Sequence, residues 1–156
     1  MTGPRVARDI MKSKIFTLSQ DMDLHDAAKF LMRHKISGAP VVDEHATLEG
    51  ILTEKDLMTA LIDAVYENLP STKVRSYMNV KPLTVAEDMG ILSIVQIFQT
   101  KPFRRLPVVT EGKLVGQISR RDVLESVVRL IEPTQDHTAA MLYLSALRDA
   151  DESPFQ

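Results

Sequence analysis

Two stretches of the chain place apolar residues on one face of a helix, and they do so in the same way. The apolar positions are Leu24, Ala27, Ala28 and Leu31 in the first stretch, and Ile91, Ile94, Val95 and Phe98 in the second. Both sets follow the i, i+3, i+4, i+7 spacing of an amphipathic helix. We expect Asp21 or Asp23 to cap the first helix and Asp88 to cap the second.

Each predicted helix is followed by two short β-rich runs and then by another helical pattern. The runs are 39–42 with 48–52 and 106–109 with 114–118, and each couple reads as an antiparallel pair. Glu111 and Gly112 predict a compact turn in the second pair, while the first pair has a longer polar connection. The later helical stripes are Leu57, Ala60, Leu61 and Ala64, then Leu124, Val127, Val128 and Ile131.

With a short strand expected near Thr17 and near Thr84, these matches are an internal duplication of a β-α-β-β-α unit. Thr17 aligns with Thr84 and Asp56 aligns with Asp122, and the offset falls by one between these two matches, so the first copy has an insertion. We place the copies at 1–67 and 74–131, joined by 68–73. A single unit of this size buries too little surface, so the copies are expected to pack face to face in one α+β fold with the helices outside.

The segment 132–156 belongs to neither copy. Pro133 and Thr134 could open a further helix, whose apolar stripe is Ala139, Leu142, Tyr143 and Ala146. That stripe needs a partner, either the body of the same chain or a second chain. The last residues, 149–156, are expected to fray.

Composition narrows the class of protein. Nineteen Lys and Arg face 21 Asp and Glu, a net charge of −2, so the whole-molecule field draws neither nucleic acid nor an anionic membrane. The 156 residues include no cysteine, which excludes disulfides, thiol nucleophiles and thiolate zinc sites. No apolar stretch approaches the roughly 18 residues that a membrane-spanning helix needs, and no charged start precedes an apolar run. We therefore expect a soluble, cytoplasmic protein without a membrane partner.

The repeated motifs resemble a pair of cystathionine β-synthase (CBS) domains, a Bateman module. The resemblance lies in 9–11, Thr17, 36–42 and 50–56 of the first copy and in 77–78, Thr84, 106–109 and 116–122 of the second. It implies pseudo-two-fold symmetry between the halves, packed sheets, a cleft on either side and a homodimer of modules. It also implies a stand-alone sensor, rather than an enzyme, that binds AMP, ADP, ATP or S-adenosylmethionine and reports occupancy to an effector protein.

The resemblance also assigns site residues in both copies. Asp56 and Asp122 would accept hydrogen bonds from ribose hydroxyls, and Thr53 and Ser119 would bind ribose or phosphate. A Thr/Ser-x-x-Asp sequence is equally well explained as a helix cap, and the two roles are compatible. The adenine would lie near 36–40 or 103–107, with the backbone at Thr17 and Thr84 reading its edge. The full set is Thr17, Ile36, Ser37, Gly38, Ala39, Pro40, Thr53, Lys55, Asp56, Thr84, Phe103, Arg104, Arg105, Leu106, Pro107, Ser119, Arg120, Arg121 and Asp122.

The basic residues of this set have two possible interpretations. Lys55 stands in the first motif, and Arg104, Arg105, Arg120 and Arg121 surround the second. They are either solvated surface charges or ligands for phosphate, with which arginine pairs bidentately. The second reading favours a nucleotide over the cationic S-adenosylmethionine. Because 104–106 is larger and more basic than its counterpart 37–39, the two clefts are expected to differ.

Other classes of function have less support in the sequence. The four histidines, His25, His34, His45 and His137, lack the i, i+4 spacing of a zinc hydrolase, and no phosphate-loop, dinucleotide or nucleophile-elbow motif is present. Aromatic residues make up only 5% of the chain, which disfavours nucleic-acid binding. A ligand-free dimerisation or interaction module stays open, because methionine-rich surfaces suit partners and the chain has eight methionines.

Overall fold

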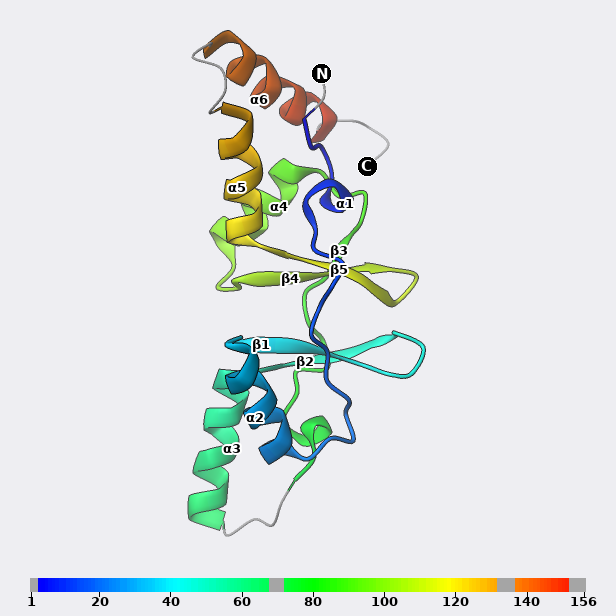
Figure 1. Cartoon of the computed structure of the whole chain (residues 1–156), viewed down its shortest axis with the longest axis vertical. Coiled ribbons are helices and arrows are strands. Elements are labelled where there is room, and N and C mark those ends of the chain that lie inside the picture. Colours follow the sequence, from blue (N-terminus) through cyan, green and yellow to red (C-terminus); the bar gives the residue numbers. More distant parts are fainter. Residues whose placement is uncertain (1–2, 68–71, 132–136, 152–156) are drawn as a thin grey trace. The chain divides into compact units, whose positions relative to one another are not determined.

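A computed structural model describes residues 3–67, 72–131 and 137–151. The chain combines helices with short strands that form two small sheets, which confirms the predicted α+β class (Figure 1). The elements are α1 (Ala7–Ile10), α2 (Leu24–His34), β1 (Gly38–Val42), β2 (Leu48–Thr53), α3 (Glu54–Glu67), the 3₁₀ turn η1 (Val74–Ser76), β3 (Val85–Ala86), α4 (Ile91–Thr100), β4 (Arg105–Thr110), β5 (Lys113–Ser119), α5 (Arg120–Ile131) and α6 (His137–Asp151).

The chain folds into two compact units that do not follow the repeat boundaries. Unit 1 comprises 1–15, 83–110 and 115–156, and unit 2 comprises 16–82 and 111–114. Most of the first copy lies in unit 2 and most of the second copy lies in unit 1. The beginning of each copy, however, lies in the unit of the other copy. The segment 1–15 accompanies the second copy, and 74–82 accompanies the first.

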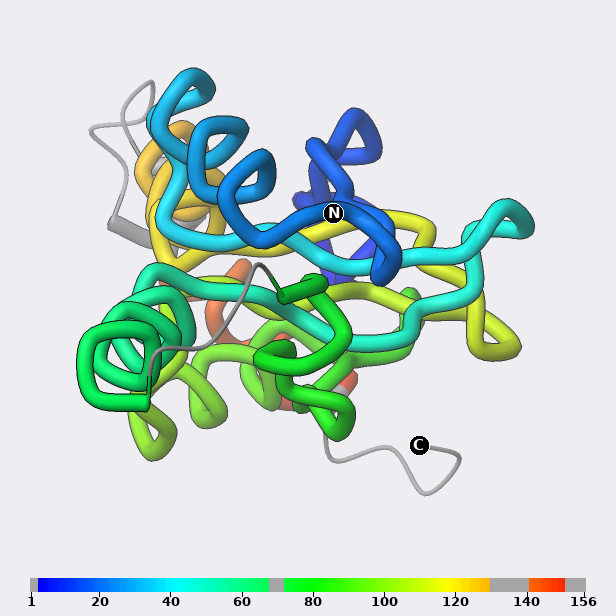
Figure 2. Tube along the Cα trace, turned by 90° about the horizontal axis from the view of Figure 1, so that it is seen from below, coloured from blue at the N-terminus to red at the C-terminus, as the bar shows by residue number. Residues whose placement is uncertain are grey.

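Unit 2 is built on the antiparallel β1–β2 pair. Gly38 pairs with Thr53, and a bulge interrupts the register between Val41 and Val42. The turn of this hairpin projects away from α2 and α3 in both views (Figures 1 and 2). The core beneath the strands consists of Leu18, Ala27, Leu31, Ala39, Val41, Leu52 and Val74.

Unit 1 holds a three-stranded sheet in the order β3-β4-β5, with β3 parallel to β4. Its core consists of Ala7, Ile10, Val85, Ile91, Ile94, Phe98, Leu106, Val108, Ile118, Val123, Tyr143 and Leu147. The compact turn predicted between β4 and β5 is confirmed, since Glu111 and Gly112 both have positive φ, 52° and 79°. This conformation gives the tight hairpin its twist and favours glycine at the second position.

The helix caps were predicted correctly in one copy and wrongly in the other. The Asp23 side chain accepts a hydrogen bond from the His25 amide, so Asp23 caps α2 as expected. Asp21 instead forms an ion pair with Arg75. The cap of α4 is Gly90 without a side-chain bond, and the prediction of Asp88 was wrong. In the alignment of the two copies Gly90 corresponds to Asp23, whereas Asp88 corresponds to Asp21.

The later helices form as predicted, but their stripes are not buried. No residue of α3 is buried, and Leu61 on its stripe is 58% exposed. On α5, Leu124 of the predicted stripe is 64% exposed, whereas its neighbour Val123, which was not in the stripe, lies in the core. The spacing located the helices correctly, but it overestimated how much of each apolar face the unit covers.

The C-terminal helix α6 belongs to unit 1. Tyr143 and Leu147 enter the core there, and the Tyr143 hydroxyl donates to the Pro4 carbonyl at 2.8 Å. Burial raises the pKa of Tyr143. Of the predicted stripe, Tyr143 thus packs into the body of the same chain, whereas Leu142 is 57% exposed. The helix runs to Asp151, so the expected fraying from residue 149 was wrong at its start. The predicted helix opening at Pro133 and Thr134 and most of the connector, 68–71, lie outside the described residues.

Candidate strand-to-helix ligand sites

The first candidate site is the junction where β2 ends and α3 begins. The carboxylate Oδ2 of Asp56 accepts from the Thr53 amide at 2.8 Å and from the Thr53 hydroxyl at 2.9 Å. The Thr53 Oγ1 in turn accepts from the Asp56 amide at 3.4 Å. The capping role predicted for this motif is therefore present. The other carboxylate oxygen of Asp56 has no hydrogen-bond partner among the described residues.

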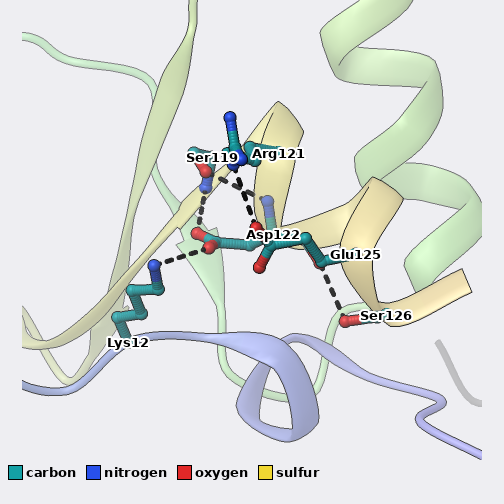
Figure 3. A network of polar contacts seen from close by, with 6 residues as sticks. All are labelled: Lys12, Ser119, Arg121, Asp122, Glu125 and Ser126. Atoms are coloured by element: carbon teal, nitrogen blue, oxygen red, sulfur yellow. Dashed lines mark hydrogen bonds and ion pairs between the residues drawn. The ribbon is translucent and has the colours of Figure 1, made fainter. Parts of the chain in front are cut away.

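The second candidate site is the matching junction between β5 and α5 (Figure 3). The Ser119 amide donates to Asp122 Oδ2 at 2.8 Å, and the Asp122 amide donates to Ser119 Oγ at 3.1 Å. Asp122 is only 7% exposed, and Lys12 Nζ lies 3.3 Å from its Oδ1. Both carboxylate oxygens of Asp122 are thus engaged. The Ser119 hydroxyl accepts within this cap but, unlike the Thr53 hydroxyl, donates to no described residue.

Each junction is preceded by a glycine that a neighbouring segment requires. A Cβ on Gly116 would lie 2.4 Å from the Met11 sulfur, and one on Gly50 would lie 2.7 Å from the Asn79 carbonyl oxygen. Antiparallel bridges hold these segments in place, Lys12 with Gln117 in unit 1 and Asn79 with Ile51 in unit 2. The repeated methionine and glycine of the sequence motif therefore mark a close approach of two chain segments beside each site.

The segments expected to hold the adenine, 36–40 and 103–107, run from a loop into β1 and β4 and lie next to the junctions. The Ser37 carbonyl accepts from the Glu54 amide at 2.9 Å, and the Arg104 carbonyl accepts from the Arg120 amide at 3.3 Å. Both bonds tie a loop to the first residue of the helix that carries the site aspartate. The side chains of Ala39 on β1 and Leu106 on β4 enter the cores of their units. These two residues can therefore offer a ligand little beyond their backbone.

The remaining members of the predicted set fall into three groups. Thr17 and Thr84 are half-buried, each one residue before a chain segment that pairs in parallel with a hairpin strand. Pro40 and Pro107 are buried; Ile36 and Gly38 are half-buried; and Phe103 is 38% exposed. Of the basic residues, Lys55, Arg104, Arg120 and Arg121 are exposed, whereas Arg105 is half-buried.

At the second site, Arg121 follows the first of the two interpretations, that of a solvated surface charge. The Arg121 side chain is 85% exposed and donates to Glu125 Oε1 at 2.9 Å along the surface of α5. It is therefore already engaged as a surface ion pair. The cation next to the site carboxylate is Lys12, which we did not select from the sequence. Comparing the residues after Met11 and Met78, which are Lys12 and Asn79, would have revealed it as a difference between the copies.

An aromatic stack beside Thr17 also escaped the sequence analysis. The Phe16 ring stacks on His34 with centroids 4.0 Å apart, and Phe30 meets His34 at 4.5 Å. Phe16 is adjacent to Thr17 in sequence, and His34 lies shortly before Ile36. Phe30 and His34 are not among the apolar positions that predicted α2. Only the aromatic character of Phe16, Phe30 and His34 could have pointed to this stack from the sequence.

Neither a metal-binding cluster nor a membrane-spanning helix occurs in the parts of the chain that the structure describes. Among these residues no group of three or more His, Cys, Asp or Glu could hold a metal ion. None of the helices described is long and apolar enough to cross a membrane.

The duplicated unit matches the CBS domain twice, and the chain belongs to the CBS domain family. The family model matches residues 7–63 and 74–129. One relative, uncharacterized protein MJ1225 of Methanocaldococcus jannaschii, is 30% identical over 118 residues. That match covers 76% of this chain but only 41% of the relative.

Solved structures of CBS-pair proteins have the same fold. CBSX2 of Arabidopsis thaliana, in complex with AMP, superposes with a TM-score of 0.71 at 26% identity, covering 81% of this chain and 98% of CBSX2. The CBS domain pair of protein MJ0100, in complex with 5′-methylthioadenosine and S-adenosyl-L-methionine, gives a TM-score of 0.65 at 26% identity. It covers 78% of this chain and 95% of that pair.

Proposed function

We propose that this protein is a regulatory module that binds an adenine nucleotide, AMP, ADP or ATP, at its two strand-to-helix junctions. The observation that carries the proposal is the duplicated cap, in which a hydroxyl and a carboxylate lie at the first turn of α3 and of α5. The AMP in CBSX2 and the adenosine derivatives in MJ0100 support this class of ligand. Binding would signal to a separate effector protein rather than start a reaction.

The chemistry of the junctions fits a ribose phosphate. The open Oδ1 of Asp56 can accept from a ribose hydroxyl, since a carboxylate offers two acceptor oxygens and no competing donor. The partial positive charge at the start of a helix favours a phosphate. Arg104, Arg105, Arg120 and Lys55 add positive charge near the same helix starts. This charge favours a nucleotide over S-adenosylmethionine, whose sulfonium is positive.

We also propose that the module is a homodimer. Beyond the stripe predicted for α3, with which it shares only Leu61, the helix has an exposed apolar stripe of Met58, Leu61, Ile62 and Val65, which are 58%, 58%, 58% and 69% exposed. Beside it, an apolar groove of about 560 Å³ runs between α2 and α3 within unit 2. Contiguous apolar surface of this kind usually marks an interface. The same surface favours the alternative function, an assembly module without a small ligand.

A melting-temperature screen with AMP, ADP, ATP and S-adenosylmethionine tests the function. A ligand present at about 100 times its dissociation constant adds roughly 2.7 kcal/mol to the folded state, and we expect this stabilisation with at least one adenine nucleotide. Asp56→Ala and Asp122→Ala should each reduce it, and the double variant should abolish it. Asp26→Ala, an exposed acid on α2 outside both sites, is the matched control.

The outcomes separate the two functions. A shift that survives in the double variant would mean that the ligand binds elsewhere. No shift with any of the four compounds would overturn the nucleotide-binding function and favour the assembly module.

A further inference from the structure

The two sites have the same backbone frame but a different residue at one position of it. In unit 1 the Lys12 amide and carbonyl exchange hydrogen bonds with Gln117, both at 2.9 Å. In unit 2 the Asn79 amide and carbonyl do the same with Ile51, at 2.8 and 3.0 Å. Lys12 directly follows Met11 and Asn79 directly follows Met78, so the two are equivalent positions of the repeat.

Their side chains act differently. The Lys12 ammonium reaches Asp122 Oδ1, so the carboxylate of the second site already has a cationic partner (Figure 3). The Asn79 side chain instead accepts from the Lys81 amide at 3.1 Å and makes no bond to Asp56. A ligand hydroxyl that approaches Asp122 must therefore compete with Lys12, whereas one that approaches Asp56 has no such competitor among the described residues.

We propose that Lys12 determines the specificity of the unit 1 site, restricting it to ligands that carry a phosphate. This inference rests on the proposed function and adds to it a selection between phosphorylated and unphosphorylated adenosine ligands. The unit 2 site, with Asn79 in the equivalent place, lacks this selection.

The physical reason is the placement of the Lys12 charge. Asp122 is 7% exposed, so removing its cation leaves a nearly buried carboxylate less well compensated. Lys12 is 70% exposed on a flexible stem, so its ammonium can move without disturbing the fold. A ligand that supplies ribose hydroxyls to Asp122 and a phosphate to the displaced ammonium satisfies both charges. Adenosine satisfies only the first and must displace Lys12 without replacing its partner.

The test isolates the unit 1 site with Asp56→Ala and measures AMP and adenosine by titration calorimetry. With Lys12 present we expect AMP to bind at least about tenfold more tightly than adenosine, in keeping with a charge-assisted pair. Lys12→Met should tighten adenosine binding and lower the AMP preference by about fivefold or more, while Lys12→Arg should preserve it. In the reciprocal background, Asp122→Ala, the change Asn79→Lys should raise the AMP preference of the unit 2 site.

The possible failures are distinguishable. If neither the wild-type protein nor any variant binds AMP or adenosine, the proposed function is wrong. If AMP binds in the Asp56→Ala protein and its preference over adenosine is the same with Lys12→Met, the role of Lys12 is wrong and the proposed function stands. Circular dichroism of each variant verifies that it is folded.

Discussion

The covered helix pair of unit 1 and the open helix pair of unit 2 show how the two copies have diverged. In unit 1, α6 packs against α4 and α5, and Tyr143 and Leu147 share a core with Ile91 and Phe98. The corresponding residues of unit 2 are Leu24, which packs against the core, and Leu31, which is part of it, and both also line the groove between α2 and α3. The extra helix covers a surface in one unit that the other leaves open.

The two candidate sites also share a common frame and differ in one part of it. Backbone bonds, caps and the close approach beside each glycine occur in both copies, whereas the side chains that reach the carboxylate do not. The duplication thus preserves the contacts that the backbone needs in order to fold. Beside the two sites the copies differ in an exposed side chain, Lys12 in one and Asn79 in the other, which can change at little cost in stability.

Leu147→Ala tests the covered helix pair and has the largest expected effect. Leu147 is 3% exposed in the unit 1 core, so its truncation should lower the free energy of unfolding by about 2–5 kcal/mol. Leu142→Ala on the same helix, where the side chain is 57% exposed, should change it by about 0.5 kcal/mol or less. Urea denaturation measures both. Equal losses in the two variants would contradict the packing of α6.

Alanine at the two glycines compares the close approaches. Gly50→Ala should cost about 1–3 kcal/mol, because the new methyl group meets the backbone oxygen of Asn79. Gly116→Ala should cost less, since the obstacle is the flexible Met11 side chain. Met11→Ala should recover part of the Gly116→Ala loss, whereas Met78→Ala should recover little of the Gly50→Ala loss. The opposite pattern of rescue in a denaturation series would show that the obstacles have been assigned wrongly.

Val65→Glu tests the open helix pair and has the smallest effect on the fold. Because Val65 is 69% exposed, the stability of the single chain should change by about 0.5 kcal/mol or less. If a second copy covers this stripe, the charge should halve the mass found by sedimentation equilibrium. Val80→Glu, at another exposed valine, 62% exposed in unit 2, should leave the mass unchanged. A wild-type protein that sediments as a single chain would rule out the homodimer.

Local features of the fold were predictable because they depend on neighbours in sequence. The spacing of apolar residues from Leu24 to Leu31 predicted α2, and Glu111 with Gly112 predicted the tight turn between β4 and β5. The caps at Asp56 and Asp122 followed from the short, fixed spacing between each carboxylate and a preceding hydroxyl. Asp88 was misassigned as a cap because acids near a helix start compete, and only the backbone shows which position is the first turn.

Features that join distant segments could not be read from the same patterns. The exposure of Leu61 depends on what else covers α3, and its spacing is identical whether it is covered or open. Lys12 and Asp122 belong to different copies of the repeat, and no local pattern connects them. The stack of Phe16 on His34 likewise forms only once α2 lies beside the segment that precedes it.

The sequence by itself determined the duplication, the α+β class, the order helix, hairpin, helix in each copy, and the capping residues of both junctions. These follow from periodicity, turn chemistry and short-range hydrogen bonding, which act between near neighbours. Only the tertiary structure decided that the segment 1–15 accompanies the second copy, that α6 covers one helix pair, and that Lys12 lies against Asp122. The reason is that these contacts depend on which long-range arrangement buries the most apolar surface and leaves the fewest charges unpaired.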